Sequence, residues 1–243
     1  MIVGLTELKT FYIVSDGEEI GRVCDILLPR GEWVVRYIAA WSEEMGRNIL
    51  LPCSCLQEVD RDKRTIRADV QRSQVEESPD MDLTKQIERQ AEQELYEYYG
   101  WPPYWLQEEQ DVNPTGVLSG EAEKMSESDQ SEFQSPELQP ATNIAGAYAV
   151  HSNEGEFGIL QDILVDAETC TVQYLAVDTP DNEGSILVET DHVSEIDWIA
   201  REVYLSLPAD MLLDSPVYRP QEPLTPELER SLHEYYDRIR KNI

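Results

Sequence analysis

The spacing of apolar residues changes along the chain from a strand period to a helix period, and it does so twice. Residues 65–70 alternate between apolar and polar side chains, and residues 202–207 do the same. A period of two predicts strands with one buried face. The run 33–41 is almost continuously apolar, which is typical of a central strand. Segments 83–98 and 224–235 place apolar residues three or four positions apart, which predicts an amphipathic helix after each set of strands.

Turn and cap signals divide these segments. Asp16-Gly17 predicts a tight hairpin between two strands. Thr225-Pro226 is typical of a helix N-terminus, because threonine caps the first turn and proline fits the first helical position. Gly100 predicts the end of the first helix.

The strongest signal is an internal duplication. Residues 21–99 align with residues 158–236 without a gap, at an offset of 137 positions. Identical residues recur at turn, strand and helix positions, among them the pairs Gly21 and Gly158, Asp25 and Asp162, Tyr37 and Tyr174, Leu95 and Leu232, Tyr98 and Tyr235, and Tyr99 and Tyr236. Repetition at a fixed offset predicts two copies of one small module.

The duplication and the strand pattern together predict a mainly β protein with some α: two small β-barrels, each followed by an amphipathic helix. With about six short strands per copy, closure into a barrel would hide the exposed strand edges. Residues 107–140 are rich in Glu, Gln, Ser and Pro and predict an acidic flexible linker. The expected parts are barrel 1 at 1–82, a helix with an aromatic extension at 83–106, the linker at 107–140, barrel 2 at 141–219 and a C-terminal helix at 220–243.

Charge narrows the expected partners. The 243 residues carry 49 acidic and 19 basic side chains, for a formal net charge of −30, and no Lys or Arg lies between Lys124 and Arg201. Such a surface repels phosphate backbones and anionic lipids, so we expect neither nucleic acid nor a membrane surface as partner. No stretch approaches the ~20 apolar residues of a membrane span, and the N-terminus lacks a secretory signal pattern. The expected location is the cytoplasm.

The cysteines and the clustered acids do not predict a metal, redox or catalytic site. The four cysteines show no metal-type or redox-type spacing: Cys24, Cys53, Cys55 and Cys170. We expect them to be reduced and structural. Four acids of the second copy could attract Ca²⁺ but lack a glycine-turn ligand loop: Glu189, Asp191, Glu195 and Asp197. The recurring Asp25 and Asp162 could act as an acid–base pair, although a hydrogen-bonding role at a turn or strand end is favoured. We expect no cofactor and no metal.

The two copies resemble a known family. The segments that carry the resemblance are 21–27, 33–38 and 49–52 in the first copy and 158–164, 173–178 and 196–198 in the second. They are similar to the PRC-barrel, the β-barrel module named after the H subunit of the purple-bacterial photosynthetic reaction centre. The resemblance implies tandem PRC-barrels of a stand-alone branch, and a module that docks onto other proteins rather than a catalyst.

The aromatic run after the first helix is the candidate partner-binding surface. Its residues combine large apolar area with a polar group, as interface anchors tend to do; they are Tyr98, Tyr99, Trp101, Tyr104 and Trp105. For the tyrosine pairs, packing on their own barrel is favoured. The extension 101–105 could dock on the other barrel or on another protein, and the sequence leaves both open.

These patterns favour a non-catalytic binding or assembly protein with an unidentified protein partner. No phosphate loop, nucleophile elbow or zinc-helix motif occurs in the sequence. One alternative is an accessory protein like the reaction-centre H subunit without its membrane anchor. The other alternative is an undetected enzyme.

Overall fold

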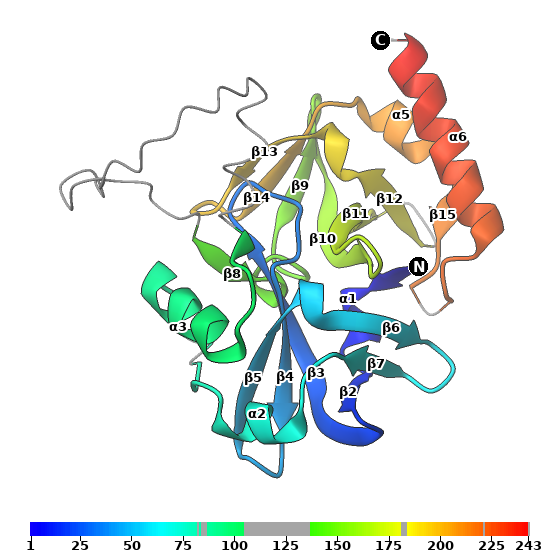
Figure 1. The fold of residues 1–243 in the computed structure, drawn as a ribbon. Helices are drawn as coiled ribbons and strands as arrows, with labels where there is room; N and C mark the ends of the chain where they lie inside the picture. The colour runs from blue at the N-terminus through cyan, green and yellow to red at the C-terminus, as the bar shows by residue number, and fades with distance from the viewer. Residues whose placement is uncertain (82, 84–86, 105–136, 181–183, 221, 243) are drawn as a thin grey trace, which may run out of the picture.

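The fold consists of two sheets and associated helices (Figure 1). The computed structural model describes residues 1–81, 83, 87–104, 137–180, 184–220 and 222–242. The first module contains β2 (Tyr12–Ser15), β3 (Glu18–Pro29), β4 (Tyr37–Ser42), β5 (Arg47–Pro52), β6 (Leu56–Asp60), β7 (Thr65–Ala68), α2 (Arg72–Glu77) and α3 (Arg89–Tyr99). The second module contains β9 (Ala149–Ser152), β10 (Gly155–Asp166), β11 (Thr171–Asp178), β12 (Ser185–Glu189), β13 (Val193–Asp197), β14 (Glu202–Leu205), α5 (Ala209–Leu213), β15 (Val217–Tyr218) and α6 (Pro226–Asn242).

The two sheets have the same strand order, as a duplication requires. The first runs β5-β4-β3-β2-β7-β6, and the second runs β12-β11-β10-β9-β14-β13 with β15 added beside β12. Neighbours are antiparallel except for one parallel pair in each sheet, β2 with β7 and β9 with β14. Among the described residues no ladder joins the two outermost strands of either sheet, so the pairing itself shows two sheets rather than closed barrels.

The turn and cap residues identified in the sequence form a turn and helix ends in the structure. Asp16 and Gly17 form the β2–β3 turn with φ of 50° and 85°, the positive values that a tight hairpin needs. The Thr225 hydroxyl accepts a hydrogen bond of 3.2 Å from the Leu228 amide at the start of α6. Gly100 ends α3 in the left-handed conformation. Helix α3, which corresponds to the helix predicted from residue 83, begins only at Arg89.

The recurring glycine of each copy marks a close approach between strands. A Cβ built on Gly21 would lie 2.8 Å from the backbone oxygen of Trp41, and one on Gly158 would collide with the backbone oxygen of Asp178. Because the obstructing atoms belong to the backbone, a side chain here would push two strands apart. This contact explains why both copies keep glycine at this position.

Each module contributes one short strand to the sheet of the other. β1 (Ile2–Gly4) pairs with β10 of the second module, and β8 (Leu138–Pro140) pairs with β3 of the first. Both pairs are antiparallel. The sequence assigned residues 138–140 to the flexible linker, but they form β8, since a three-residue strand is too short to show a period. The exchange makes the two sheets parts of one structure.

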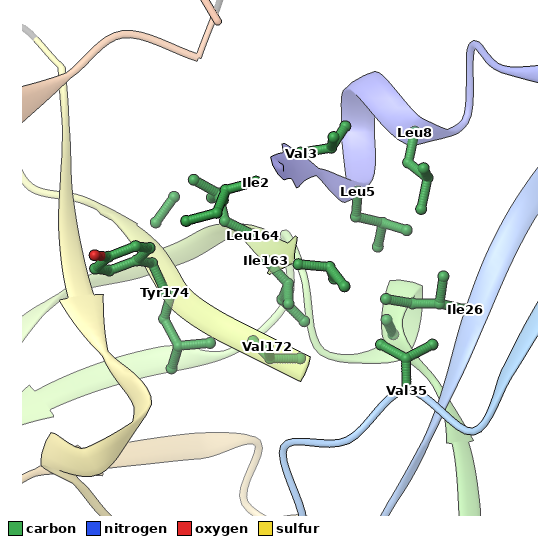
Figure 2. Packing of buried hydrophobic residues seen from close by; sticks show 14 of the residues in the cluster. Ile2, Val3, Leu5, Leu8, Ile26, Val35, Ile163, Leu164, Val172 and Tyr174 are labelled. Carbon is green, nitrogen blue, oxygen red and sulfur yellow. The ribbon is translucent and has the colours of Figure 1, made fainter. Parts of the chain in front are cut away.

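The hydrophobic core runs through this exchange without a break. The segment formed by β1 and α1 (Leu5–Leu8) buries Val3 and Leu5 between the modules, where they lie near Ile26 of β3 and Ile163 of β10 (Figure 2). A smaller cluster lies between the first sheet and α3, around Tyr37 and Leu95. In the described part of the chain, no helix is long and apolar enough to cross a bilayer.

A disulfide joins the modules, which corrects the expectation of four reduced cysteines. Cys53, before β6, is bonded to Cys170, in the turn between β10 and β11, with Cα atoms 6.2 Å apart. Beside it the Val35 amide donates a 2.7 Å hydrogen bond to the Cys170 carbonyl oxygen. The bond links residues 117 positions apart, so spacing could not reveal it. The remaining thiols are Cys24 and the buried Cys55, and burial raises the pKa of Cys55 to about 12.

Replacing Cys53 with Ser should lower the free energy of unfolding by about 2–4 kcal/mol, since the disulfide restricts the unfolded chain. Denaturant titration in non-reducing buffer measures this loss. Cys24→Ser is the matched control and should leave stability nearly unchanged, because Cys24 is outside the disulfide. Equal stability of wild type and Cys53→Ser, with and without reductant, would show that the bond does not stabilise the fold.

Candidate functional site

The aromatic residues after the first helix pack on their own module. The Tyr99 and Trp101 rings are stacked with centroids 4.0 Å apart, and both lie against the cluster under α3. Tyr98 is 38% exposed, and its hydroxyl donates a 2.8 Å hydrogen bond to the Gln74 carbonyl oxygen. The described part of the extension therefore lies on the first module. Trp105 is outside the described residues.

The extension also covers a buried carboxylate. Glu92 of α3 is 1% exposed and accepts hydrogen bonds from the Tyr37 hydroxyl at 2.7 Å and the Tyr104 hydroxyl at 3.2 Å. Arg89 lies 3.4 Å from the other carboxylate oxygen, and the Arg36 guanidinium lies over the Tyr104 ring. Burial raises the pKa of Glu92 above its ordinary value. The arrangement fastens α3 and the extension to the sheet.

The second tyrosine pair is held in a similar way. The Tyr235 hydroxyl donates to the Met211 carbonyl oxygen, at the position equivalent to Gln74 in the first module. The Tyr236 hydroxyl donates a 2.6 Å hydrogen bond to the Leu187 carbonyl oxygen, and its ring is fully buried. In each pair the second tyrosine, rather than the first, lies deeper against the sheet. The recurrence of the pairs thus reflects how each helix docks.

Trp101→Ala should destabilise the protein by about 2–4 kcal/mol, because the ring fills space against Tyr99 and Tyr96. Thermal or denaturant unfolding measures the loss. Tyr98→Phe removes one exposed hydrogen bond and should cost less than about 1 kcal/mol. An unchanged stability of Trp101→Ala would return this residue to the candidates for partner binding.

The recurring aspartates hold the exchanged segments. The Asp25 carboxylate accepts hydrogen bonds from the amide and the hydroxyl of Thr142, just after β8. Asp162 accepts a 3.2 Å hydrogen bond from the Thr6 amide in α1. Burial raises the pKa of both carboxyl groups. Each aspartate accepts hydrogen bonds from the N-terminal segment of the other module. Because the two carboxylates bind different segments, they do not form an acid–base pair.

Asp25→Ala should cost about 1–3 kcal/mol, because the Thr142 amide loses its buried acceptor. Asp25→Asn should cost less than about 1 kcal/mol, since its amide oxygen still accepts and its NH₂ can donate to the Thr142 hydroxyl. Denaturant titration of both variants measures the difference, and equal losses would contradict it.

The raised pKa of Asp25 also gives the wild type a pH dependence that Asp25→Asn lacks. A folded-state pKa above the unfolded value makes the ionised form the costly one. Wild-type stability relative to Asp25→Asn should therefore rise as pH falls from neutral through the folded-state pKa. A difference independent of pH would contradict the assigned cause.

Two of the four acids grouped in the second module, Glu189 and Asp191, are paired with a basic residue. Arg240 of α6 lies 3.0 Å from a carboxylate oxygen of Glu189 and 3.4 Å from one of Asp191. Within the described ranges, no group of three or more His, Cys, Asp or Glu side chains is placed to hold a metal ion. Glu189 and Asp191 therefore belong to the docking of α6, whereas the Asp197 carboxylate accepts hydrogen bonds from the Ile199 and Ala200 amides of its own turn.

A row of three large side chains crosses the exposed face of the first sheet. Tyr12 of β2 is the register partner of Arg22 of β3, and Arg22 is the partner of Trp41 of β4. Directly paired residues point to the same face of a sheet, so the three side chains lie side by side. Tyr12 is 37% and Trp41 42% exposed. The Arg22 guanidinium donates a 3.0 Å hydrogen bond to the Lys9 carbonyl oxygen, which holds it in place.

The row lines a groove with a volume of about 670 Å³. Its walls include the half-buried thiol of Cys24 and side chains of both charges, among them Lys9 and Glu43. The sequence did not reveal this site, because Tyr12, Arg22 and Trp41 are far apart in the chain and meet only through the strand register. The equivalent positions of the second module are Ala149, Ile159 and Asp178, so the row is particular to the first.

Comparison of the chain with protein families and with curated proteins found no match. The row combines Tyr, Arg and Trp, the residue types that dominate binding energy at protein interfaces. Its side chains offer apolar area, a fixed positive charge and hydroxyl and indole donors. This chemistry suits recognition of another protein.

Proposed function

We propose that the chain is a non-catalytic docking protein whose first module binds a protein partner through Tyr12, Arg22 and Trp41. The observation that carries the proposal is the exposure of two aromatic rings on either side of an arginine, across three neighbouring strands. Interface hot spots are enriched in these residue types and tend to pair with hot spots on the partner.

The internal duplication supports the proposal. The second module keeps the same strand order but carries small, aliphatic or acidic residues at the corresponding positions. Packing of the fold therefore does not require the aromatic row. The tandem PRC-barrel resemblance agrees with such a role, since modules of that family dock rather than catalyse. Under this proposal each sheet with its helix is a PRC-type barrel, and the first one carries the binding face.

The proposal is tested by purifying the tagged protein from its source cells and quantifying co-purified proteins by mass spectrometry. The wild type should retain one protein in near-stoichiometric amount. The double variant Tyr12→Ala/Trp41→Asp, which takes the residues of the second module, should lose most of it.

The matched control is Ile159→Ser, which changes an exposed residue at the position equivalent to Arg22. It should retain the partner. The absence of any stoichiometric protein would refute a docking role, and a partner retained equally by the double variant would move the binding surface away from the row. Unchanged thermal unfolding of the variants ensures that lost binding is not lost folding.

A further inference from the structure

A second concave surface lies between the modules, separate from the row of Tyr12, Arg22 and Trp41. The end of β3 and the segment after it form one wall through Pro29 and Trp33, and strand β13 with the turn after it forms the other through Ile196 and Trp198. The groove has a volume of about 180 Å³. Sites for cofactors or drug-sized molecules typically occupy about 300–1,000 Å³, so this groove fits one large side chain better than a whole small molecule.

The turn between β13 and β14 adds an unusually exposed apolar residue. Ile199 follows Trp198 and is 97% exposed. The hairpin at the same place in the first module carries Arg61 and Asp62 instead. Arg61 there pairs with Glu7 at 2.9 Å and donates to the Ile2 carbonyl oxygen at 2.8 Å. Since the charged version builds the same hairpin, the apolar Trp198 and Ile199 are not needed to form it.

The surroundings of the groove point to a basic partner. Glu195 lines it from the second module, and Glu32, which is also paired with Arg36 at 2.8 Å, lines it from the first. The wall from the second module contains no Lys or Arg, because none occurs between Lys124 and Arg201. The guanidinium of Arg30 lies 5.2 Å from the centre of the Trp198 ring, so one cation–π contact of this ring is made within the chain. Arg30 is itself neutralised by Glu137 at 2.9 Å.

We propose that this inter-module groove binds a segment of a partner protein that presents one large apolar side chain flanked by lysine or arginine. The apolar side chain enters between Trp33 and Trp198 and contacts Ile199. The flanking cations lie near Glu195 and add electrostatic attraction to the strongly acidic protein. This site goes beyond the proposed function, because it specifies a partner chemistry and does not use the aromatic row.

The test is a fluorescence anisotropy titration of the full chain with short fluorescein-labelled peptides. One has a central leucine flanked by arginine and lysine, a second has glycine at the centre, and a third has glutamate in place of the basic residues. The first should bind most tightly, and the third should not bind. The double variant Trp198→Arg/Ile199→Asp introduces the residues that the first module has at the equivalent positions. It should weaken binding of the leucine peptide about tenfold or more.

Two further variants sharpen the test. Ile199→Asp alone changes an exposed position, so the fold should be kept. The variant should bind the leucine peptide more weakly than the wild type does. Tyr12→Ala/Trp41→Asp should bind the peptide as the wild type does. Loss of peptide binding at the groove can then be distinguished from loss of partner binding at the aromatic row. Equal binding of the leucine and glycine peptides, equal binding by wild type and Trp198→Arg/Ile199→Asp, or no binding of any peptide would overturn the proposal.

Discussion

The structure depends on the reciprocal exchange of the two N-terminal strands. β1 completes the sheet of the second module and β8 that of the first, and each is followed by a short turn whose backbone amide meets a buried aspartate of the other module. An unpaired strand edge and an unpaired buried carboxylate are both costly. The exchange removes both costs at once, and only when the two modules are together. The continuous core, with Leu5 between the sheets, follows from the same arrangement. The duplicated chain thus behaves as a dimer whose two halves are covalently joined.

Much of the secondary structure could be predicted from the sequence, because it rests on local signals. The alternation at 65–70 buries Ile66, Ala68 and Val70, and the hairpin at Asp16-Gly17 and the caps of both helices form where their residue types require. The exchange could not be predicted, since its strands are only three residues long and their partners lie in the other copy. The disulfide could not be predicted either, because cysteines that pair across an interface between modules have no characteristic spacing in the sequence.

The candidate sites show the same limit. The aromatic run after α3 is conspicuous in the sequence, yet Trp101 and Tyr104 serve the packing of α3 and the burial of Glu92. Tyr12, Arg22 and Trp41 are inconspicuous one by one and become a site only through strand register. A dense aromatic segment in one stretch of chain therefore says less about binding than aromatic residues that the fold gathers and leaves exposed.

The duplication separates what the fold requires from what it leaves free. Features kept in both copies, such as the close-approach glycines, the buried aspartates and the tyrosine pairs, all have a structural explanation in contacts between strands, modules or helices. Two features present in one copy have no such explanation among the described residues: the row on the first sheet and the apolar hairpin tip at Ile199 are absent from the other copy without loss of the corresponding strands. An exposed Trp or Ile gains little by remaining in water, and its apolar area is stabilised only when something covers it. Since the described residues leave these side chains exposed, the surfaces that distinguish the two modules are the candidates for binding.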